Sequence, residues 1–183
     1  TIHGGTVTAT GGQYGTGIGG GDYGHGGTVT INGGTVTATG RDYCAGIGGG
    51  DDGDGGTVTI NGGIVTATGG NYGAGIGGGN SGDGGTVTIN GGTVAARGTE
   101  GGADIGPGFD GTIAGSNTFT GGSIRLVNDM IAPAPSNNTE RVWCVTVTNL
   151  PPNTAVVVAA LGVYGVNDLF ADETGALYLW LPD

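Results

Sequence analysis

The chain has 183 residues, including 48 glycines and 6 prolines, and its formal net charge is −11. Glycine does not recur at every third position, which excludes a collagen triple helix, and the acidic composition disfavours nucleic acid and anionic membranes as partners. No apolar run is long enough to cross a bilayer, so we expect no membrane insertion of this segment.

A repeat of 29 residues dominates the first two thirds of the chain. The motif Thr-Val-Thr-Ile-Asn begins at Thr28, Thr57 and Thr86, and an isoleucine recurs with the same step at 18, 47, 76 and 105. Threonine alternates with valine or isoleucine inside each repeat, which is typical of strands with one buried face. Glycine pairs supply the turns. The sequence therefore predicts an all-β fold over residues 1–126, a right-handed parallel β-helix (β-solenoid) with one coil per repeat.

The two ends of the repeat region differ from its middle. Residues 1–3 align with residues 30–32 one repeat later, so we expect the first coil to be truncated and the chain to be part of a larger protein. The repeat that begins at Gly91 is irregular and contains Glu100, Asp104 and Pro107. Residues 118–126 then match residues 88–96 with one inserted position, which predicts a final coil.

The composition changes after Leu126. Residues 127–140 are rich in proline, serine and asparagine and predict a linker. Residues 141–183 contain three apolar, strand-like runs, and we expect a small β cap there, because the last coil of a solenoid exposes its core and strand edges. Cys44 and Cys144 are the only cysteines and define neither a disulfide framework nor a metal site, and whether they pair is left open.

Three loops place polar side chains one above another in successive coils: GGGDYGHGG, GGGDDGDGG and GGGNSGDGG. Stacked carboxylates about 5 Å apart would repel one another, and a bound hard cation would relieve that repulsion. The candidate calcium ligands are Asp22, Asp51, Asp54, Asn80 and Asp83. The alternative is that these residues are solvated turn formers, in which case the chain has no cofactor.

A second recurring feature is a ladder of tyrosines, Tyr14, Tyr43 and Tyr72. Exposed tyrosines beside hydroxyl and carboxylate groups suit a sugar, which has apolar faces and polar edges. The alternative is a corner stack that closes the core, and alternation cannot be carried across the glycine turn to decide between them.

Rows of outward-facing threonine provide further candidate glycan contacts, for which we select Thr35, Thr37 and Thr66. Regular threonine rows are also used by ice-binding solenoids. Here Ile64 and Arg97 interrupt the rows, and threonine is in any case a favoured exposed strand residue.

The motifs GGTVTATGG, GAGIGGG and GGTVTINGG resemble the Gly/Thr-rich right-handed β-helix regions of large surface proteins from Gram-positive, often gut-dwelling bacteria. The segment NDLFADETGALYLWLP resembles a small β module that often follows such repeats. This resemblance implies an extracellular setting, either secreted or on the cell surface. A related group of β-helix proteins binds acidic sugars and calcium, so the resemblance also favours a glycan partner.

The sequence contains no nucleophile–base pair and no cofactor-binding loop that we can identify. We therefore expect a non-enzymatic adhesin or stalk segment that contacts a polysaccharide or a host or bacterial glycan. A polysaccharide-degrading β-helix enzyme is the first alternative, with Glu100, Asp104 and Asp110 as the acids in the break of the repeat. An ice-binding solenoid is the second alternative.

Overall fold

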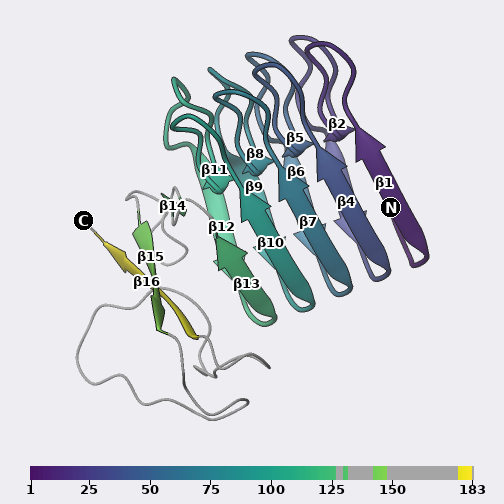
Figure 1. The fold of residues 1–183 in the computed structure, drawn as a ribbon, viewed down its shortest axis with the longest axis vertical. Coiled ribbons are helices and arrows are strands. Elements are labelled where there is room, and N and C mark those ends of the chain that lie inside the picture. The colour runs from purple at the N-terminus through teal and green to yellow at the C-terminus, as the bar shows by residue number, and fades with distance from the viewer. Residues whose placement is uncertain (127–129, 132–141, 148–176, 183) are drawn as a thin grey trace.

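The structure, a computed structural model, describes residues 1–126, 130–131, 142–147 and 177–182. Each coil contributes three strands, and every strand pairs in parallel with its equivalents in the neighbouring coils (Figure 1). The chain therefore forms the right-handed parallel β-helix that the repeat predicts, and the described residues contain no helix.

The strands assemble into three sheets. The first sheet contains, in order, β1 (Thr6–Thr10), β4 (Thr35–Thr39), β7 (Ile64–Thr68), β10 (Thr93–Arg97) and β13 (Ser123–Leu126). The second contains β3 (Thr28–Ile31), β6 (Thr57–Ile60), β9 (Gly85–Ile89) and β12 (Gly115–Phe119). The third begins with the two-residue strands β2 (Ile18–Gly19), β5 (Ile47–Gly48), β8 (Ile76–Gly77) and β11 (Ile105–Gly106).

The pairing register reproduces the sequence repeat. Thr28 pairs with Thr57, a step of 29 residues, whereas Thr93 pairs with Ser123, a step of 30. The single inserted residue expected before the last coil is thus accommodated between β10 and β13, in the loops, and the strands stay in register.

The third sheet continues beyond the coils. β14 (Met130–Ile131) pairs in parallel with β11, and then β15 (Val142–Val147) and β16 (Leu177–Pro182) add antiparallel strands. The C-terminal segment therefore extends one sheet past the last coil. Most of the expected linker (127–140) and much of the expected cap (141–183) lie outside the described residues, so their boundaries remain predictions.

The core is a set of aliphatic rows that run along the axis of the β-helix, two from each of the first and second sheets and one from the third. Every second residue of a strand points inward, as the alternation predicts: Val36 and Ala38 are fully buried, whereas Thr35 is exposed. Burial of each such valine or isoleucine contributes about 1.5–3 kcal/mol. The fully buried isoleucines and valines are Ile31, Ile47, Ile60, Ile76, Ile89, Ile105, Val36, Val58, Val65, Val87 and Val94.

Close packing on the third sheet requires glycine. Gly48 has φ of +135°, and a Cβ atom there would lie 2.0 Å from the carbonyl oxygen of Gly77 in the next coil. A side chain cannot be accommodated at that distance, so the coils are thin along this face.

A ladder of asparagine side chains lines the turns between the second and first sheets. Asn61 Nδ2 donates to Asn32 Oδ1 at 2.8 Å, and Asn90 Nδ2 donates to Asn61 Oδ1 at the same distance. His3 and Thr120 hydrogen-bond to the two ends of this row. The edge of the β-helix with these short turns is therefore held by identical amide contacts in successive coils.

Candidate functional site

The opposite edge of the β-helix carries two longer loops per coil, and we call this surface the loop edge (Figure 1). In the second coil the first loop spans residues 40–46 and the second spans residues 49–56. Backbone hydrogen bonds connect loops of different coils. The amide of Asn80 donates to the carbonyl of Tyr43 at 2.7 Å, and that of Phe109 donates to the carbonyl of Tyr72 at 2.9 Å. The loops of neighbouring coils are thus fastened into one continuous surface.

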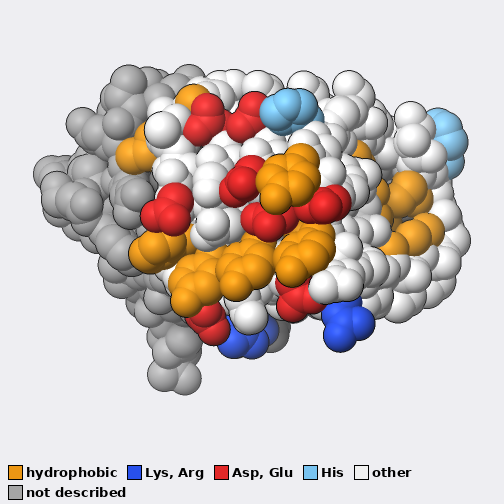
Figure 2. All heavy atoms as spheres, turned by 90° about the horizontal axis from the view of Figure 1, so that it is seen from above, with side chains coloured by type: hydrophobic (Ala, Val, Ile, Leu, Met, Phe, Trp, Pro, Cys, Tyr) orange, Lys and Arg blue, Asp and Glu red, His pale blue; other side chains and the backbone are white. Residues whose placement is uncertain are grey.

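The three predicted tyrosines form a stacked row on the loop edge. The rings of Tyr14 and Tyr43 are 6.4 Å apart with an interplanar angle of 9°, and those of Tyr43 and Tyr72 are 5.8 Å apart at 6°. Figure 2 looks onto this edge and shows a row of hydrophobic side chains crossing the coils, with acidic side chains on both sides. The rings therefore lie on the surface and do not close the core, whose described members are aliphatic residues and Phe119.

The backbone conformation directs these rings outward. Tyr14, Tyr43 and Tyr72 have φ of 55°, 72° and 62°, in the left-handed region that residues with a side chain rarely adopt. Each stands third in a four-residue turn closed by a hydrogen bond, as between the Cys44 amide and the Arg41 carbonyl at 3.1 Å. Such a conformation costs about 1–3 kcal/mol. Backbone strain of this kind is typical of functional sites, and here it recurs in three successive coils.

The row ends at Phe109, which the sequence analysis did not select. In the fourth coil the tyrosine position is occupied by Gly101, and the ring of Phe109 from the second loop lies 5.3 Å from that of Tyr72 at 56°. A Cβ atom on Gly101 would lie 2.5 Å from Phe109 Cδ2, so the ring fills the space that the missing side chain leaves. Two features of the sequence could have indicated this contact: position 101 lacks the tyrosine of the repeat, and an aromatic residue follows eight positions later.

An acidic side chain lies beside the last tyrosine. The Glu100 carboxylate, which is also hydrogen-bonded to the phenol, raises the pKa of Tyr72, because a phenolate would stand next to a second negative charge. Tyr72 therefore stays a neutral hydrogen-bonding group throughout the physiological range.

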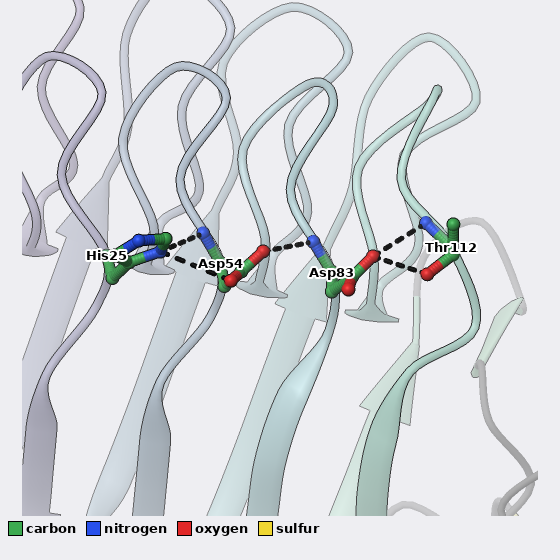
Figure 3. Close-up of polar contacts among 4 residues, drawn as sticks. All are labelled: His25, Asp54, Asp83 and Thr112. Atoms are coloured by element: carbon green, nitrogen blue, oxygen red, sulfur yellow. Dashed lines mark hydrogen bonds and ion pairs between the residues drawn. The ribbon is translucent and has the colours of Figure 1, made fainter.

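The candidate calcium ligands fall into two rows. In the first row, Asp54 and Asp83 are bound to the backbone of the next coil (Figure 3). The Asp83 amide donates to Asp54 Oδ1 at 3.0 Å, and both the amide and Oγ1 of Thr112 donate to Asp83 Oδ1, at 3.0 and 2.5 Å. His25 begins the row, because its Nδ1 accepts from the Asp54 amide at 3.1 Å and lies 3.2 Å from Asp54 Oδ2. Backbone amides thus supply hydrogen bonds to these carboxylates.

The second row contains Asp22, Asp51 and Asn80. Partial burial raises the pKa of Asp51, and the neighbouring carboxylates of Asp52 and Asp22 raise it further. Asn80 Nδ2 donates to Ser81 Oγ at 3.3 Å. Within the described ranges, no three side chains of His, Cys, Asp or Glu converge in the manner of a metal site. Calcium binding at these residues remains a prediction.

Cys44 lies beneath this row as a free thiol. It is fully buried, and burial raises the pKa of the thiol to about 12, with the carboxylates of Asp51, Asp42 and Asp22 contributing in the same direction. The thiol therefore stays protonated and unreactive near neutral pH.

The threonine candidates lie apart from the tyrosines. Thr35, Thr37 and Thr66 belong to strands β4 and β7 and face outward from the first sheet, whereas the tyrosines occupy the loops beyond those strands (Figure 1). The structure therefore does not bring the two sets of predicted glycan contacts into a single site. The outward threonine surface is interrupted by the half-exposed side chain of Ile64 and by Arg97.

The three acids of the irregular repeat do not share a cleft. Asp104 is completely buried, and its Oδ1 accepts a hydrogen bond of 2.7 Å from the Gly98 amide. Glu100 and Asp110 are exposed. Asp104 is therefore a structural residue that a polysaccharide chain could not reach, and it cannot pair with Glu100 in acid–base chemistry on one substrate.

Comparison with known proteins identifies the class of fold. A sequence family described as Beta helix repeat matches residues 1–22, 29–51 and 58–80, which lie in the first three coils. The chain thus contains a β-helix repeat region, as both the repeat and the sheet topology indicate. No match was found among curated proteins or among solved structures. In the described part of the chain, no helix is long and apolar enough to cross a membrane.

Proposed function

We propose that this chain is a non-enzymatic, elongated segment of a secreted or cell-surface bacterial protein, and that its loop edge contacts glycans. The observation that carries the proposal is the row of parallel tyrosine rings on the surface of the loop edge, with Tyr43 exposed and Tyr14 and Tyr72 half-buried, which continues across three coils and ends at Phe109. A β-helix holds these rings at fixed intervals, so a linear polymer can contact several of them at once.

The geometry defines which atoms a sugar would meet. Because the rings stack on one another, most of the contact would be made by ring edges, phenol hydroxyls and the flanking carboxylates. The hydroxyl groups of a sugar can donate to the carboxylates and exchange hydrogen bonds with the phenols, while its C–H faces lie against the ring edges. Each contact is weak, but contacts in several coils add through effective concentration.

A glycan array probed with the purified chain tests the proposal. We expect binding to extended polysaccharides, and loss of most of it in Tyr43→Asn, which removes the central ring but tolerates the left-handed backbone. Thr57→Ala, an exposed change on the second sheet, is the matched control and should leave binding unchanged. If the chain binds no glycan on the array, glycan contact is refuted and the segment acts as a structural spacer.

The enzymatic alternative is tested on the same glycans. Release of reducing ends from any bound polysaccharide, abolished by Glu100→Gln, would overturn the non-enzymatic assignment. We expect no release, because Asp104 is buried and inaccessible and therefore cannot act with Glu100 on one substrate.

A further inference from the structure

The tyrosine row runs in the direction in which the coils stack. Tyr14, Tyr43 and Tyr72 follow one another at steps of 29 residues, and each occupies the same hydrogen-bonded turn of its own coil. Neighbouring ring centroids are 6.4 and 5.8 Å apart, and Phe109 follows at 5.3 Å. The loop edge therefore presents one ring per coil along a line parallel to the axis of the β-helix (Figure 2).

Stacking decides which part of each ring a ligand can reach. The rings of Tyr14, Tyr43 and Tyr72 are nearly parallel, so each ring covers much of the faces of its neighbours and leaves its edge to solvent. Tyr43, which has a ring on both sides, is 37% exposed, and Phe109 at the end of the row is 50% exposed. A compact sugar can contact only one or two of these narrow edges, whereas an extended chain laid along the row contacts all four.

Polar residues of the second loops lie directly beside the tyrosines. The amide of Asn80 donates to the Tyr43 carbonyl at 2.7 Å, as the amide of Phe109 does to the Tyr72 carbonyl at 2.9 Å. Asp51 stands one repeat before Asn80 and occupies the equivalent place in the preceding coil. Both side chains are half-buried, so this border of the row carries fixed groups that accept hydrogen bonds.

The first loops add negative charge to the row. Asp42 precedes Tyr43 in the chain, and Glu100 is hydrogen-bonded to the phenol of Tyr72. The described loops contain one arginine, Arg41, and many more carboxylates, which Figure 2 shows on both sides of the row. The electrostatic potential along the row is therefore negative.

This potential selects against acidic polysaccharides. A chain of uronate units would bring carboxylates close to Asp51 and Glu100, and like charges a few ångströms apart repel one another even in water. The hydroxyls of a neutral chain instead donate hydrogen bonds to the same carboxylates. The surface thus differs from what a resemblance to β-helix proteins that bind acidic sugars would suggest.

The interval between the rings restricts the linkage of the polymer. Strands of successive coils are about 4.8 Å apart, and the ring centroids follow at 5.3 to 6.4 Å. In a β-1,4-linked chain of glucose or mannose the units are almost fully extended, and each advances the chain by about the length of one pyranose ring, a distance similar to these intervals. An α-1,4-linked glucose chain coils, so its units leave a straight row after the first contacts.

We propose that the tyrosine row binds a neutral, β-1,4-linked hexose chain that lies parallel to the axis of the β-helix and places one sugar unit on each ring. This inference rests on the proposed glycan contact and specifies the charge, the linkage and the orientation of the polymer. Four consecutive units cover Tyr14, Tyr43, Tyr72 and Phe109, and their hydroxyls donate to the carboxylates that border the row.

Calorimetric titration with oligosaccharides of one to six units tests the length and the linkage. The probes are β-1,4-linked oligomers of glucose and of mannose, with α-1,4-linked glucose oligomers for comparison. We expect the affinity for a β-1,4-linked series to rise with each unit up to four and then to level off, because the row has four rings. The preferred β-1,4-linked hexamer should bind about tenfold more tightly than the α-1,4-linked hexamer, which reaches fewer rings.

A charged probe of the same linkage tests the electrostatic part. The hexamer of β-1,4-linked glucuronic acid has the backbone of the glucose hexamer with a carboxylate on every unit. We expect it to bind about tenfold more weakly than the neutral hexamer, and added salt should reduce the difference.

A shortened row tests the assignment of one unit to each ring. Phe109→Asn leaves three rings, so the affinity should level off at three units, while binding of the trisaccharide should stay unchanged. Ile64→Thr is the matched control, because it removes an exposed apolar side chain from the first sheet, away from the row. It should bind every probe as the unmodified chain does.

Several results would overturn the inference while leaving glycan contact intact. These are equal affinity for the α- and β-linked hexamers, an affinity that does not rise with length, and tighter binding of the glucuronic acid hexamer, with or without calcium. Failure of every neutral β-1,4-linked probe to bind would refute the inference whatever the array shows. Only silence of the entire array would refute glycan contact as well.

Discussion

Asp54 and Asp83 are equivalent residues of neighbouring coils, and the Asp83 amide donates a hydrogen bond of 3.0 Å to Asp54 Oδ1. Each carboxylate of this row therefore binds the backbone of the following coil, as the donation from the Thr112 amide to Asp83 repeats. These donors could not be predicted from the sequence, because side-chain spacing alone does not show where the amides of the loops point.

This contact predicts a clear difference between two substitutions at one position. Asp54→Ala removes the acceptor of the Asp83 amide and should lower the free energy of unfolding by about 0.5–1.5 kcal/mol. Asp54→Asn keeps an oxygen in the same place and should retain most of the stability. Urea denaturation followed by circular dichroism measures both variants. Equal loss in the two would show that the charge, and not the acceptor, is what stabilises the loop.

Asp51 gives a prediction for pH. Its folded-state pKa is raised by partial burial and by Asp52 and Asp22, so the ionised form opposes folding, and this unfavourable contribution is present above the folded pKa. Stability from this site should therefore increase as the pH falls through the folded pKa, where the carboxyl becomes protonated. Asp51→Asn should raise the melting temperature at neutral pH, and its advantage should disappear in acid. A gain that persists unchanged at low pH would contradict this account.

The core gives a prediction with an internal control. Ile76→Ala empties part of a fully buried row between two coils and should cost about 2–5 kcal/mol, whereas Ile76→Val should cost about 0.5–1.5 kcal/mol. Ile64 is 55% exposed on the first sheet at a position where neighbouring coils have threonine, and Ile64→Thr should change stability by less than about 0.5 kcal/mol. Chemical denaturation of the three variants tests whether the core lies where the alternation places it.

Much of the fold was predictable from the sequence, because one repeat fixes the period, the inward valines and the register at once. Val36, Val65 and Val94 follow from alternation, and their burial required no knowledge of the loops. The tyrosine row was also predictable in outline. Its exposure was not, because it depends on the left-handed backbone at Tyr43, which alternation along a strand does not determine.

The sequence could not predict how the irregular coil completes the row. Phe109 stands where the preceding coils have Asp22, Asp51 and Asn80. It comes from the other loop, so its contact with Tyr72 depends on the conformations of two loops together. In the same way, burial of Asp104 and exposure of Glu100 separate two acids that lie close in sequence.

Calcium remains a prediction that thermal unfolding can test. A calcium site at Asp22, Asp51 and Asn80 would raise the melting temperature with increasing calcium through mass action, and Asp51→Asn would abolish the increase. Magnesium, which demands a smaller and more regular octahedral site, should have a weaker effect. An equal increase with magnesium and with sodium chloride of matched ionic strength would indicate screening of the acidic surface alone.

The end of the tyrosine row allows a test of coupling between the two loops. Gly101→Tyr restores the residue of the regular repeat, but its Cβ would lie 2.5 Å from Phe109 Cδ2, so the single variant should be destabilised. Phe109→Asn introduces the residue that the preceding coil has at this position, Asn80, and removes the obstructing ring. The double variant should therefore be more stable than Gly101→Tyr alone, with a favourable coupling energy of about 1–3 kcal/mol in a double-mutant cycle. Additive effects would show that Phe109 does not occupy the position vacated at Gly101. If the row of tyrosines binds glycans, the double variant should also bind them more tightly, since its fourth ring carries a phenol hydroxyl that Phe109 lacks.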